Sequence, residues 1–596
     1  MSVLDRIERL RNVMEQQKID CYIIPTDDYH HSEYVGDYFK FREYITGFTG
    51  SAGTAVFTKD KAGLWTDGRY FIQAEAQLKG SGITLYKSGE SDVPTIEEFL
   101  KSELKEGDVL GFDGRTVTYA QGKRYCHIAD ENGASLKYRL DLAQNIWKER
   151  PEMSMESVFS LADEYTGEKI GSKLERIREI MKENGCNAHV LSSLDDIAWL
   201  LNIRGNDIAY CPLVLSYAIV YNNSVELFAD IRKFSDDIIN LLAENQVKIY
   251  PYEDIYRKVS EMTSEDKLLL DSAIMNYSLY QAISKETVIV DKQNPEILMK
   301  SVKNETQAEN LRKAHLKDAV AHTKFMYWLK KNIGRVEITE LSASARLEGL
   351  RAEQEHFLGP SFGPISAYGE HGAIVHYSAD EKSNVPLKEG KLFMTDTGGH
   401  YLEGSTDITR TVALGEVGNI EKEHFTLVAR AMLRLANTVF LYGCSGANLD
   451  CIAREIFWKE GLNFNHGTGH GVGYLLNIHE GPINFRWKEG ERPAPALEEN
   501  MVITDEPGIY IEGSHGIRLE NELLVRKTVK NEYGQFMNFE ILTYVPIDLD
   551  AILPEKMSTE EKEMLNHYHK QVYEKVSPYL SEEERIWLKE YTRAVK

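Results

Sequence analysis

His466-Gly-Thr-Gly-His470-Gly-Val-Gly-Tyr-Leu-Leu-Asn-Ile-His479-Glu480 is the stretch from which the rest of the chain can be interpreted. Its three histidines fall within fourteen residues and are separated by four glycines. Histidine is the commonest metal ligand and the usual proton carrier near neutral pH. Glycine has no side chain, so we expect the backbone here to approach a ligand closely. A glycine-rich turn with surface histidines is the alternative, and the rest of the chain must decide.

Length and charge limit the possible functions. A chain of 596 residues predicts roughly two to four domains. The net charge of -24 argues against a nucleic-acid partner or an acidic membrane surface. Six cysteines without a CxxC pair indicate reduced thiols. The charged N-terminus is not a secretory signal, and the longest apolar run, at residues 213–221, is too short to span a bilayer. We therefore expect a cytoplasmic protein without a membrane partner.

The first half of the chain contains a weak internal repeat. A helical pattern at residues 4–14, an apolar strand at 21–24 and an acidic turn at 26–28 are followed by strands and by an Asp-x-Arg-x-Phe ending at 67–71. The same order returns with a helix at 174–181, a strand at 190–191, a turn at 194–196, strand pattern at 213–221 and a similar ending at 230–234. This repeat of about 160 residues predicts two related α/β domains. The Asp-Arg pairs of both endings are expected to be structural ion pairs.

The second half has a different pattern of predicted helices and strands. A charged helical run at residues 300–331 has apolar positions spaced for one buried face. Short strands punctuated by glycine follow from Ser361 onward. Ser558-Thr-Glu-Glu561 and Ser581-Glu-Glu-Glu584 are capping-box patterns, which predict a helical end of the chain. The predicted domains are therefore 1–160, 161–300 and 301–596, the last with a C-terminal helical extension.

Asp396 and Asp407 form the first candidate pair of acids. An apolar strand leads into Asp396, Gly398-Gly399 is expected to make a turn, and a second strand runs on from Asp407. Two buried carboxylates repel each other, and a divalent cation would remove that repulsion. Acids in an ordinary turn remain the alternative.

Glu506 and Glu520 lie inside further apolar runs. Arg518 and Glu520 share one face if their segment is a strand. A buried glutamate needs a partner, and for either residue alone a salt bridge would suffice. Together, two aspartates, one or two histidines and two glutamates on consecutive strand-like segments suit two ions of manganese, cobalt(II), iron(II) or zinc. Five ligands for two ions leave open positions, which is typical of a catalytic site.

This order of acids and histidine resembles a known family. Asp396, Asp407, His470, Glu506 and Glu520 follow the ligand order of the pita-bread metallopeptidases, which include methionine aminopeptidase, prolidase and aminopeptidase P. The motif from His466 to His470, with the later His479-Glu480, resembles the proline-specific branch. Three further stretches and the three-part architecture resemble the long, three-domain Xaa-Pro aminopeptidases: Gly47-Phe-Thr-Gly-Ser51, Ser301-Val-Lys-Asn-Glu305 and Phe539-Glu-Ile-Leu-Thr-Tyr-Val-Pro546.

The resemblance implies a fold and a reaction. The fold class would be α/β (α+β), with two related, creatinase-like N-terminal domains before a pita-bread catalytic domain. The enzyme would release the first residue from peptides with proline in second position, as a homodimer. The cofactors would be two divalent metal ions, Mn²⁺ first, with Co²⁺ or Zn²⁺ as alternatives.

The resemblance also implies a role for each residue of the metal site. Asp407 and Glu520 would bridge the ions, Asp396 would complete one ion, and His470 with Glu506 the other. A hydroxide between the ions would be the nucleophile, and Glu506 would manage its proton.

Five further residues would surround the substrate. His376 and His479 would hydrogen-bond the scissile carbonyl, and His466 would lie beside the proline pocket. Arg518 and Tyr510 would orient ligands by hydrogen bonds. Without the resemblance, His376 could equally be a core histidine.

Two alternatives remain open. Prolidase cleaves Xaa-Pro dipeptides with the same ligands, but it usually has one N-terminal domain, so the internal repeat argues against it. An inactive peptide-binding relative would keep the fold without catalysis, and the complete set of ligands argues against that.

Overall fold

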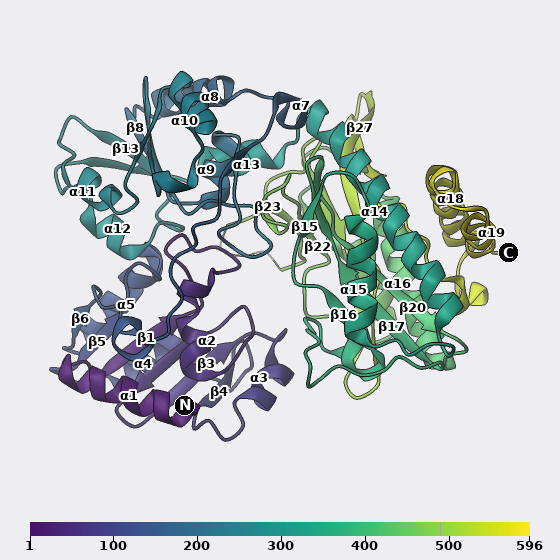
Figure 1. Cartoon of the computed structure of the whole chain (residues 1–596), viewed down its shortest axis with the longest axis horizontal. Helices are drawn as coiled ribbons and strands as arrows, with labels where there is room; N and C mark the ends of the chain where they lie inside the picture. The colour runs from purple at the N-terminus through teal and green to yellow at the C-terminus, as the bar shows by residue number, and fades with distance from the viewer. Residues whose placement is uncertain (489, 491) are drawn as a thin grey trace. The chain divides into compact units, whose positions relative to one another are not determined.

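The computed structural model describes residues 1–488, 490 and 492–596, which divide into two compact units (Figure 1). One unit comprises Met1–Leu161 and Glu168–Glu296, and the other comprises Ala162–Gly167 and Ile297–Lys596. Among the described residues, no helix combines the length and the apolar character needed to cross a membrane.

The N-terminal unit is built on two six-stranded sheets with the same topology. The strand orders are β4-β3-β2-β1-β5-β6 and β12-β11-β10-β8-β13-β14. In each sheet the central strand pairs antiparallel with one neighbour and parallel with the other. The first sheet comprises β1 (Cys21–Pro25), β2 (Thr54–Thr58), β3 (Ala62–Thr66), β4 (Thr84–Lys87), β5 (Val109–Phe112) and β6 (Ser135–Lys137). The second comprises β8 (Ala188–Leu191), β10 (Tyr217–Tyr221), β11 (Val225–Phe228), β12 (Val247–Tyr250), β13 (Lys267–Leu270) and β14 (Val288–Asp291). The predicted internal repeat is confirmed.

Corresponding helices begin the two halves of this unit. α1 (Val3–Gln16) buries Ile7, Leu10 and Met14, which recur at helical spacing on one face, and α8 (Ile170–Glu183) begins the second half. The other helices of this unit are α2 (Phe41–Thr46), α3 (Phe71–Gln77), α4 (Ile96–Glu103), α5 (Tyr119–Glu131), α6 (Ala143–Ile146), α9 (Leu194–Leu200), α10 (Asp236–Glu244), α11 (Asp254–Ser260) and α12 (Tyr277–Ala282).

Two local predictions for the second half need correction. The expected acidic turn at residues 194–196 is the first turn of α9, where the helix dipole favours acidic side chains. The strand expected at 213–221 begins only at Tyr217. The expected ion pairs are present, with Asp67 2.8 Å from Arg69 and Asp230 2.5 Å from Arg232.

The C-terminal unit contains one six-stranded sheet and several smaller ones. The large sheet has the order β21-β28-β27-β24-β22-β23. It comprises β21 (Phe440–Leu441), β22 (Gly469–Gly471), β23 (Glu480–Phe485), β24 (Val502–Asp505), β27 (Asn521–Asn531) and β28 (Gly534–Ile541). The smaller sheets comprise β15 (Phe357–Pro360), β18 (Gly399–Tyr401) and β19 (Gly404–Ser405); β16 (Ile365–Tyr368), β17 (Lys391–Thr397) and β20 (Ile408–Leu414); and β25 (Gly508–Ile511) with β26 (His515–Arg518).

Long helices cover these sheets. Figure 1 shows α14 (Glu305–Asn332), α15 (Glu340–Ala352) and α16 (Asn419–Ala436) gathered over β17 and β20, and one apolar core joins all five elements. α17 (Gly446–Lys459) packs on α16. The tail forms α18 (Thr559–Val576) and α19 (Glu582–Tyr591), each starting with the predicted capping box. The helices hold the sheets in place, so that strand ends can present polar side chains.

Candidate active site

Asp396 and Asp407 lie on one long hairpin. β17 and β20 pair antiparallel with Asp396 opposite Thr409, and Asp407 immediately precedes β20. The register continues through β18 and β19, where Tyr401 pairs with Gly404. The hairpin is therefore present, but its turn is at residues 402–403 rather than at the predicted Gly398-Gly399. Asp396 and Asp407 are 8% and 3% exposed.

His470, Glu506 and Glu520 come from the large sheet and its edges. His470 is the middle residue of β22, Glu506 follows β24, and Glu520 precedes β27. β24 pairs with both β22 and β27, so the three segments are neighbours. The backbone N–H of Glu520 donates to the Thr409 carbonyl at 3.1 Å. This bond fixes the start of β27 against the hairpin that carries the aspartates.

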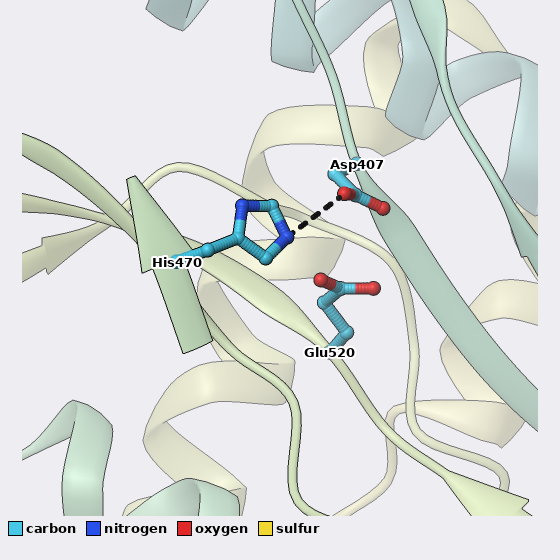
Figure 2. A group of neighbouring side chains, drawn as sticks. All are labelled: Asp407, His470 and Glu520. Atoms are coloured by element: carbon cyan, nitrogen blue, oxygen red, sulfur yellow. Dashed lines mark ion pairs between the residues drawn. The ribbon is translucent and has the colours of Figure 1, made fainter. Parts of the chain in front are cut away.

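Three of these side chains form one cluster. Asp407, His470 and Glu520 each offer a ligand atom, and these atoms lie within 4.8 Å of one another. Figure 2 shows them converging from three different segments. Nε2 of His470 is 3.5 Å from Oδ2 of Asp407 and 3.6 Å from Oε1 of Glu506. These separations exceed an ordinary hydrogen bond and suit atoms that share a cation.

One hydrogen bond indicates which nitrogen of His470 would bind metal. Its Nδ1 is 3.0 Å from the carbonyl oxygen of Gly471. A carbonyl only accepts, so Nδ1 carries the hydrogen. Nε2 then presents its lone pair to the carboxylates, as a metal-ligating imidazole requires.

The carboxyl groups of the cluster repel one another. Burial raises the pKa of Asp407 well above its ordinary value, and Asp396 and Glu506 raise it further. Burial and Asp407 likewise raise the pKa of Glu520. Burial raises the pKa of Glu506, opposed by His470. Oδ1 of Asp396 is buried without a hydrogen-bond partner. Divalent cations would satisfy that oxygen and relieve the repulsion, so four carboxylates and an imidazole fit two such ions.

A chain of hydrogen bonds links Asp396, Arg518, Tyr510 and His466. Nε of Arg518 donates to Oδ2 of Asp396 at 3.1 Å, and Nη1 donates to the Tyr510 hydroxyl at 2.6 Å. Nδ1 of His466 lies 2.7 Å from the Gly467 carbonyl and must carry the hydrogen, so Nε2 accepts from Tyr510 at 2.9 Å. Burial lowers the pKa of His466 to about 3 and raises that of Tyr510 to about 12. Both residues stay neutral near pH 7, and both ring nitrogens of His466 are in use.

The two remaining histidines lie at different parts of the site. His479 is exposed, and its ring centroid is 4.2 Å from that of His470. His376 follows Val375, whose carbonyl oxygen is 3.4 Å from Nη2 of Arg518. His479 is therefore adjacent to the His470 ligand, and the His376 segment is adjacent to Arg518.

Comparison with known proteins decides the family. Residues 6–137 and 149–307 match the Creatinase/Prolidase N-terminal domain, 309–527 match Metallopeptidase family M24, and 535–595 match the C-terminal region of that peptidase. Xaa-Pro aminopeptidase 1 of Dictyostelium discoideum is 36% identical over 97% of this chain and 94% of its own length. The chain belongs to the Xaa-Pro aminopeptidases of metallopeptidase family M24.

Other relatives of this aminopeptidase match over the same extent. Aminopeptidase P1 of Arabidopsis thaliana is 35% identical over 99% of both chains. The X-prolyl aminopeptidase of Caenorhabditis elegans, described as a cytosolic enzyme with a di-nuclear active site, is 34% identical, covers 100% of both chains and has a TM-score of 0.95. The predicted family, fold class and enzyme class are confirmed.

Two glycines of the aminopeptidase's histidine-rich stretch serve strand packing. A Cβ on Gly469 would lie 1.8 Å from the carbonyl oxygen of Thr504, and one on Gly471 would lie 2.3 Å from that of Glu480. At these two positions the missing side chain makes room for a neighbouring strand, and close approach of a ligand stays a prediction. They allow β22 to lie very close to both neighbouring strands.

Several residues around the Asp407, His470 and Glu520 cluster were not predicted. The Glu522 side chain accepts the backbone N–H of Asp407 at 2.7 Å, and its other oxygen is 3.1 Å from Nε2 of His315. The Thr409 hydroxyl donates to Glu520 at 2.7 Å. Glu522 could have been found, since it follows Glu520 at the two-residue spacing of one strand face. His315 lies on α14 and gave no signal in the sequence.

Proposed function

We propose that the protein removes the N-terminal residue from peptides whose second residue is proline, and that it acts on peptides longer than two residues. The observation that supports this most is the meeting of Asp407, His470 and Glu520 in a chain whose full-length relatives are named Xaa-Pro aminopeptidases. Proline has no amide hydrogen and a fixed φ. An enzyme for such peptides must therefore recognise the ring rather than a backbone N–H.

Five side chains would hold two divalent cations. They are Asp396, Asp407, His470, Glu506 and Glu520. When bound, such ions lower the pKa of a water molecule and so supply a nucleophile near neutral pH. Manganese is the proposed metal, with cobalt or zinc as alternatives, because oxygen donors with one imidazole suit these ions.

Glu506 is the proposed proton carrier. It would accept the proton of the attacking water and deliver it to the prolyl nitrogen as the Xaa–Pro bond breaks. The water oxygen joins the carbonyl carbon, and the leaving peptide gains the hydrogen on its proline nitrogen.

His479 and His376 are proposed to stabilise the reacting carbonyl. Each would donate a hydrogen bond to the carbonyl oxygen as negative charge develops on it. The exposure of His479 beside His470 supports this role, because a substrate can reach it. For His376 the support is its neighbour Val375, whose carbonyl contacts Arg518.

The proline ring is proposed to lie against the chain of His466, Tyr510 and Arg518. Both ring nitrogens of His466 are already bonded, so this residue would offer the face of its ring to the substrate. Arg518 and Tyr510 would keep that ring in a fixed orientation.

Cleavage of matched peptides tests this function. The wild-type protein should hydrolyse an Xaa-Pro-Yaa tripeptide and leave the matching Xaa-Ala-Yaa peptide intact. Glu506→Gln should lose about 10²–10⁴-fold in kcat. Hydrolysis of an Xaa-Pro dipeptide without hydrolysis of the tripeptide would identify a prolidase. Full metal binding without any hydrolysis would identify an inactive peptide-binding relative.

We also propose a cytoplasmic homodimer with domains 1–160, 161–300 and 301–596. Six free cysteines support a reducing compartment. Light scattering of the purified protein would test the dimer, and limited proteolysis would test the domain boundaries. A net charge of -24 supports the absence of nucleic-acid and membrane partners.

A further inference from the structure

Two short motifs far apart in the sequence meet through one buried ion pair. Nζ of Lys303 donates to Oε1 of Glu480, the first residue of β23. The two side chains are 1% and 2% exposed. The same Nζ also donates to the carbonyl oxygen of Lys300 at 2.9 Å. Neither Lys303 nor Glu480 has a part in the proposed reaction.

A buried ion pair of this kind adds little to stability. Moving both charges out of water offsets much of their attraction, and apolar side chains of similar size often stabilise a fold as well or better. What such a pair can add is a defined geometry between two segments.

The Lys303 end of the pair is firmly held. Its backbone N–H donates to the Asn500 carbonyl at 3.1 Å, and Val302 forms a bridge with Met501. The next residue, Asn304, is the N-cap of the 28-residue helix α14 and closes a capping box. Lys303 therefore has a fixed position from which its side chain contacts Glu480.

The position of Glu480, at the other end of the pair, depends more on the contacts of its side chain. His470 pairs with Asn484, but the following residue, Gly471, pairs with Glu480. The register is therefore interrupted between the two pairs, and strand pairing by itself determines the place of Glu480 less strictly than a continuous ladder would. The contact with Lys303 adds a side-chain constraint at this interruption.

His479 is the group whose position follows from this constraint. Ile478 and Glu480 on either side are 1% and 3% exposed, whereas His479 is exposed. Its ring lies beside that of His470, with the centroids 4.2 Å apart. We propose that Lys303 and Glu480 are positioning residues that hold His479 in place for the substrate carbonyl. This inference rests on the role proposed above for His479.

Removing both charges together tests the inference without leaving one ion alone in the core. The variant combines Lys303→Met with Glu480→Gln, and kcat, KM and bound metal are measured with an Xaa-Pro-Yaa peptide. We expect kcat to fall about 10²-fold, as for a misplaced catalytic group. We expect KM and metal content within about twofold of wild type, because no ligand is changed. His479→Ala should lose a similar factor, as expected for one lost donor.

Combining the changes separates positioning from general damage. In the His479→Ala background, removal of Lys303 and Glu480 should lower kcat by less than about twofold more, because residues acting through one group are not additive. Losses that multiply, or loss of metal from the Lys303→Met and Glu480→Gln variant, would overturn the inference.

A matched control removes another buried ion pair. Lys330 on α14 is 2.6 Å from Asp548, and their side chains are 8% and 0% exposed. Asp548 contacts the backbone of Ala413, six residues along the chain from Asp407. Lys330→Met with Asp548→Asn should lower the thermal midpoint and leave kcat unchanged.

A spectroscopic measurement makes the inference independent of activity. The measurement is an NMR spectrum of isotope-labelled histidines in the zinc-loaded protein. The imidazole signal of His479 is assigned as the one that is missing from the spectrum of His479→Ala. It should shift or broaden in the Lys303→Met and Glu480→Gln variant, and an unchanged signal would refute the positioning role. If wild type cleaves no Xaa-Pro peptide but the signal moves, the proposed function fails, whereas the coupling of Lys303 and Glu480 to the position of His479 is retained.

Discussion

Arg518→Lys tests whether the planar guanidinium, and not only its charge, is needed. The guanidinium donates to Asp396, with Nε at 3.1 Å, and to the Tyr510 hydroxyl at 2.6 Å. A lysine ammonium keeps the charge but cannot make both contacts in this fork geometry. We expect it to stay with the carboxylate, so the contact with Tyr510 is lost. A buried hydrogen bond to a charged group contributes about 1.5–3 kcal/mol. That corresponds to a loss of about 10- to 150-fold in kcat/KM.

The assay is steady-state hydrolysis of an Xaa-Pro-Yaa peptide, together with metal analysis. Tyr510→Phe removes the same contact from the other side, so the double variant should lose no more than about twofold beyond either single change. Bound metal should stay at the wild-type level, since the lysine ammonium still lies beside the Asp396 carboxylate. Arg312→Lys is the matched control, because Arg312 makes a two-nitrogen pair with Glu540 at a partly exposed site. Wild-type kcat/KM in Arg518→Lys, or loss of both metals, would refute the reasoning.

Three further predictions concern metal, packing and pH. His470→Ala should lose bound metal as well as rate, and mass spectrometry showing full metal would contradict its role as a ligand. Gly471→Ala should destabilise the protein by about 1–3 kcal/mol, because the added Cβ would lie 2.3 Å from a backbone oxygen; Gly349→Ala, with open space around it, should not, and calorimetry compares the two. Burial lowers the pKa of His569 to about 3, below an unfolded value of about 6.5. Between these pH values the unfolded state binds more protons, so stability falls as pH decreases. The thermal midpoint of His569→Gln should fall less between pH 7 and 5 than that of wild type, and an equal fall would contradict the assignment.

Much of the fold could be predicted from local patterns. Ile7, Leu10 and Met14 recur at helical spacing, and the structure buries them on one face of α1. The capping boxes at Ser558 and Ser581 mark the true starts of α18 and α19. These signals are reliable because helix caps and amphipathic faces depend on residues only a few positions apart. The turn of the Asp396 hairpin was misplaced, because Gly398-Gly399 has turn composition but the strand pairing continues past it.

The candidate site was predicted as residue types, without its connections. The acids and histidines of the metal cluster stand out in the sequence because charged groups inside apolar runs need partners. By contrast, nothing local indicates that His315 lies beside Glu522 or that both ring nitrogens of His466 are occupied.

By itself, the sequence determined the internal repeat, the starts of α18 and α19, the family and the residue types of a two-metal site. Only the tertiary structure decided which segments meet: Lys303 with Glu480, 177 residues away, and Glu522 with the backbone of Asp407, 115 residues away. The physical reason is the distance along the chain over which each kind of interaction acts. Helix caps and hydrophobic periodicity act over a few residues, whereas contacts between distant segments depend on how the helices and sheets of the whole unit pack around a common core.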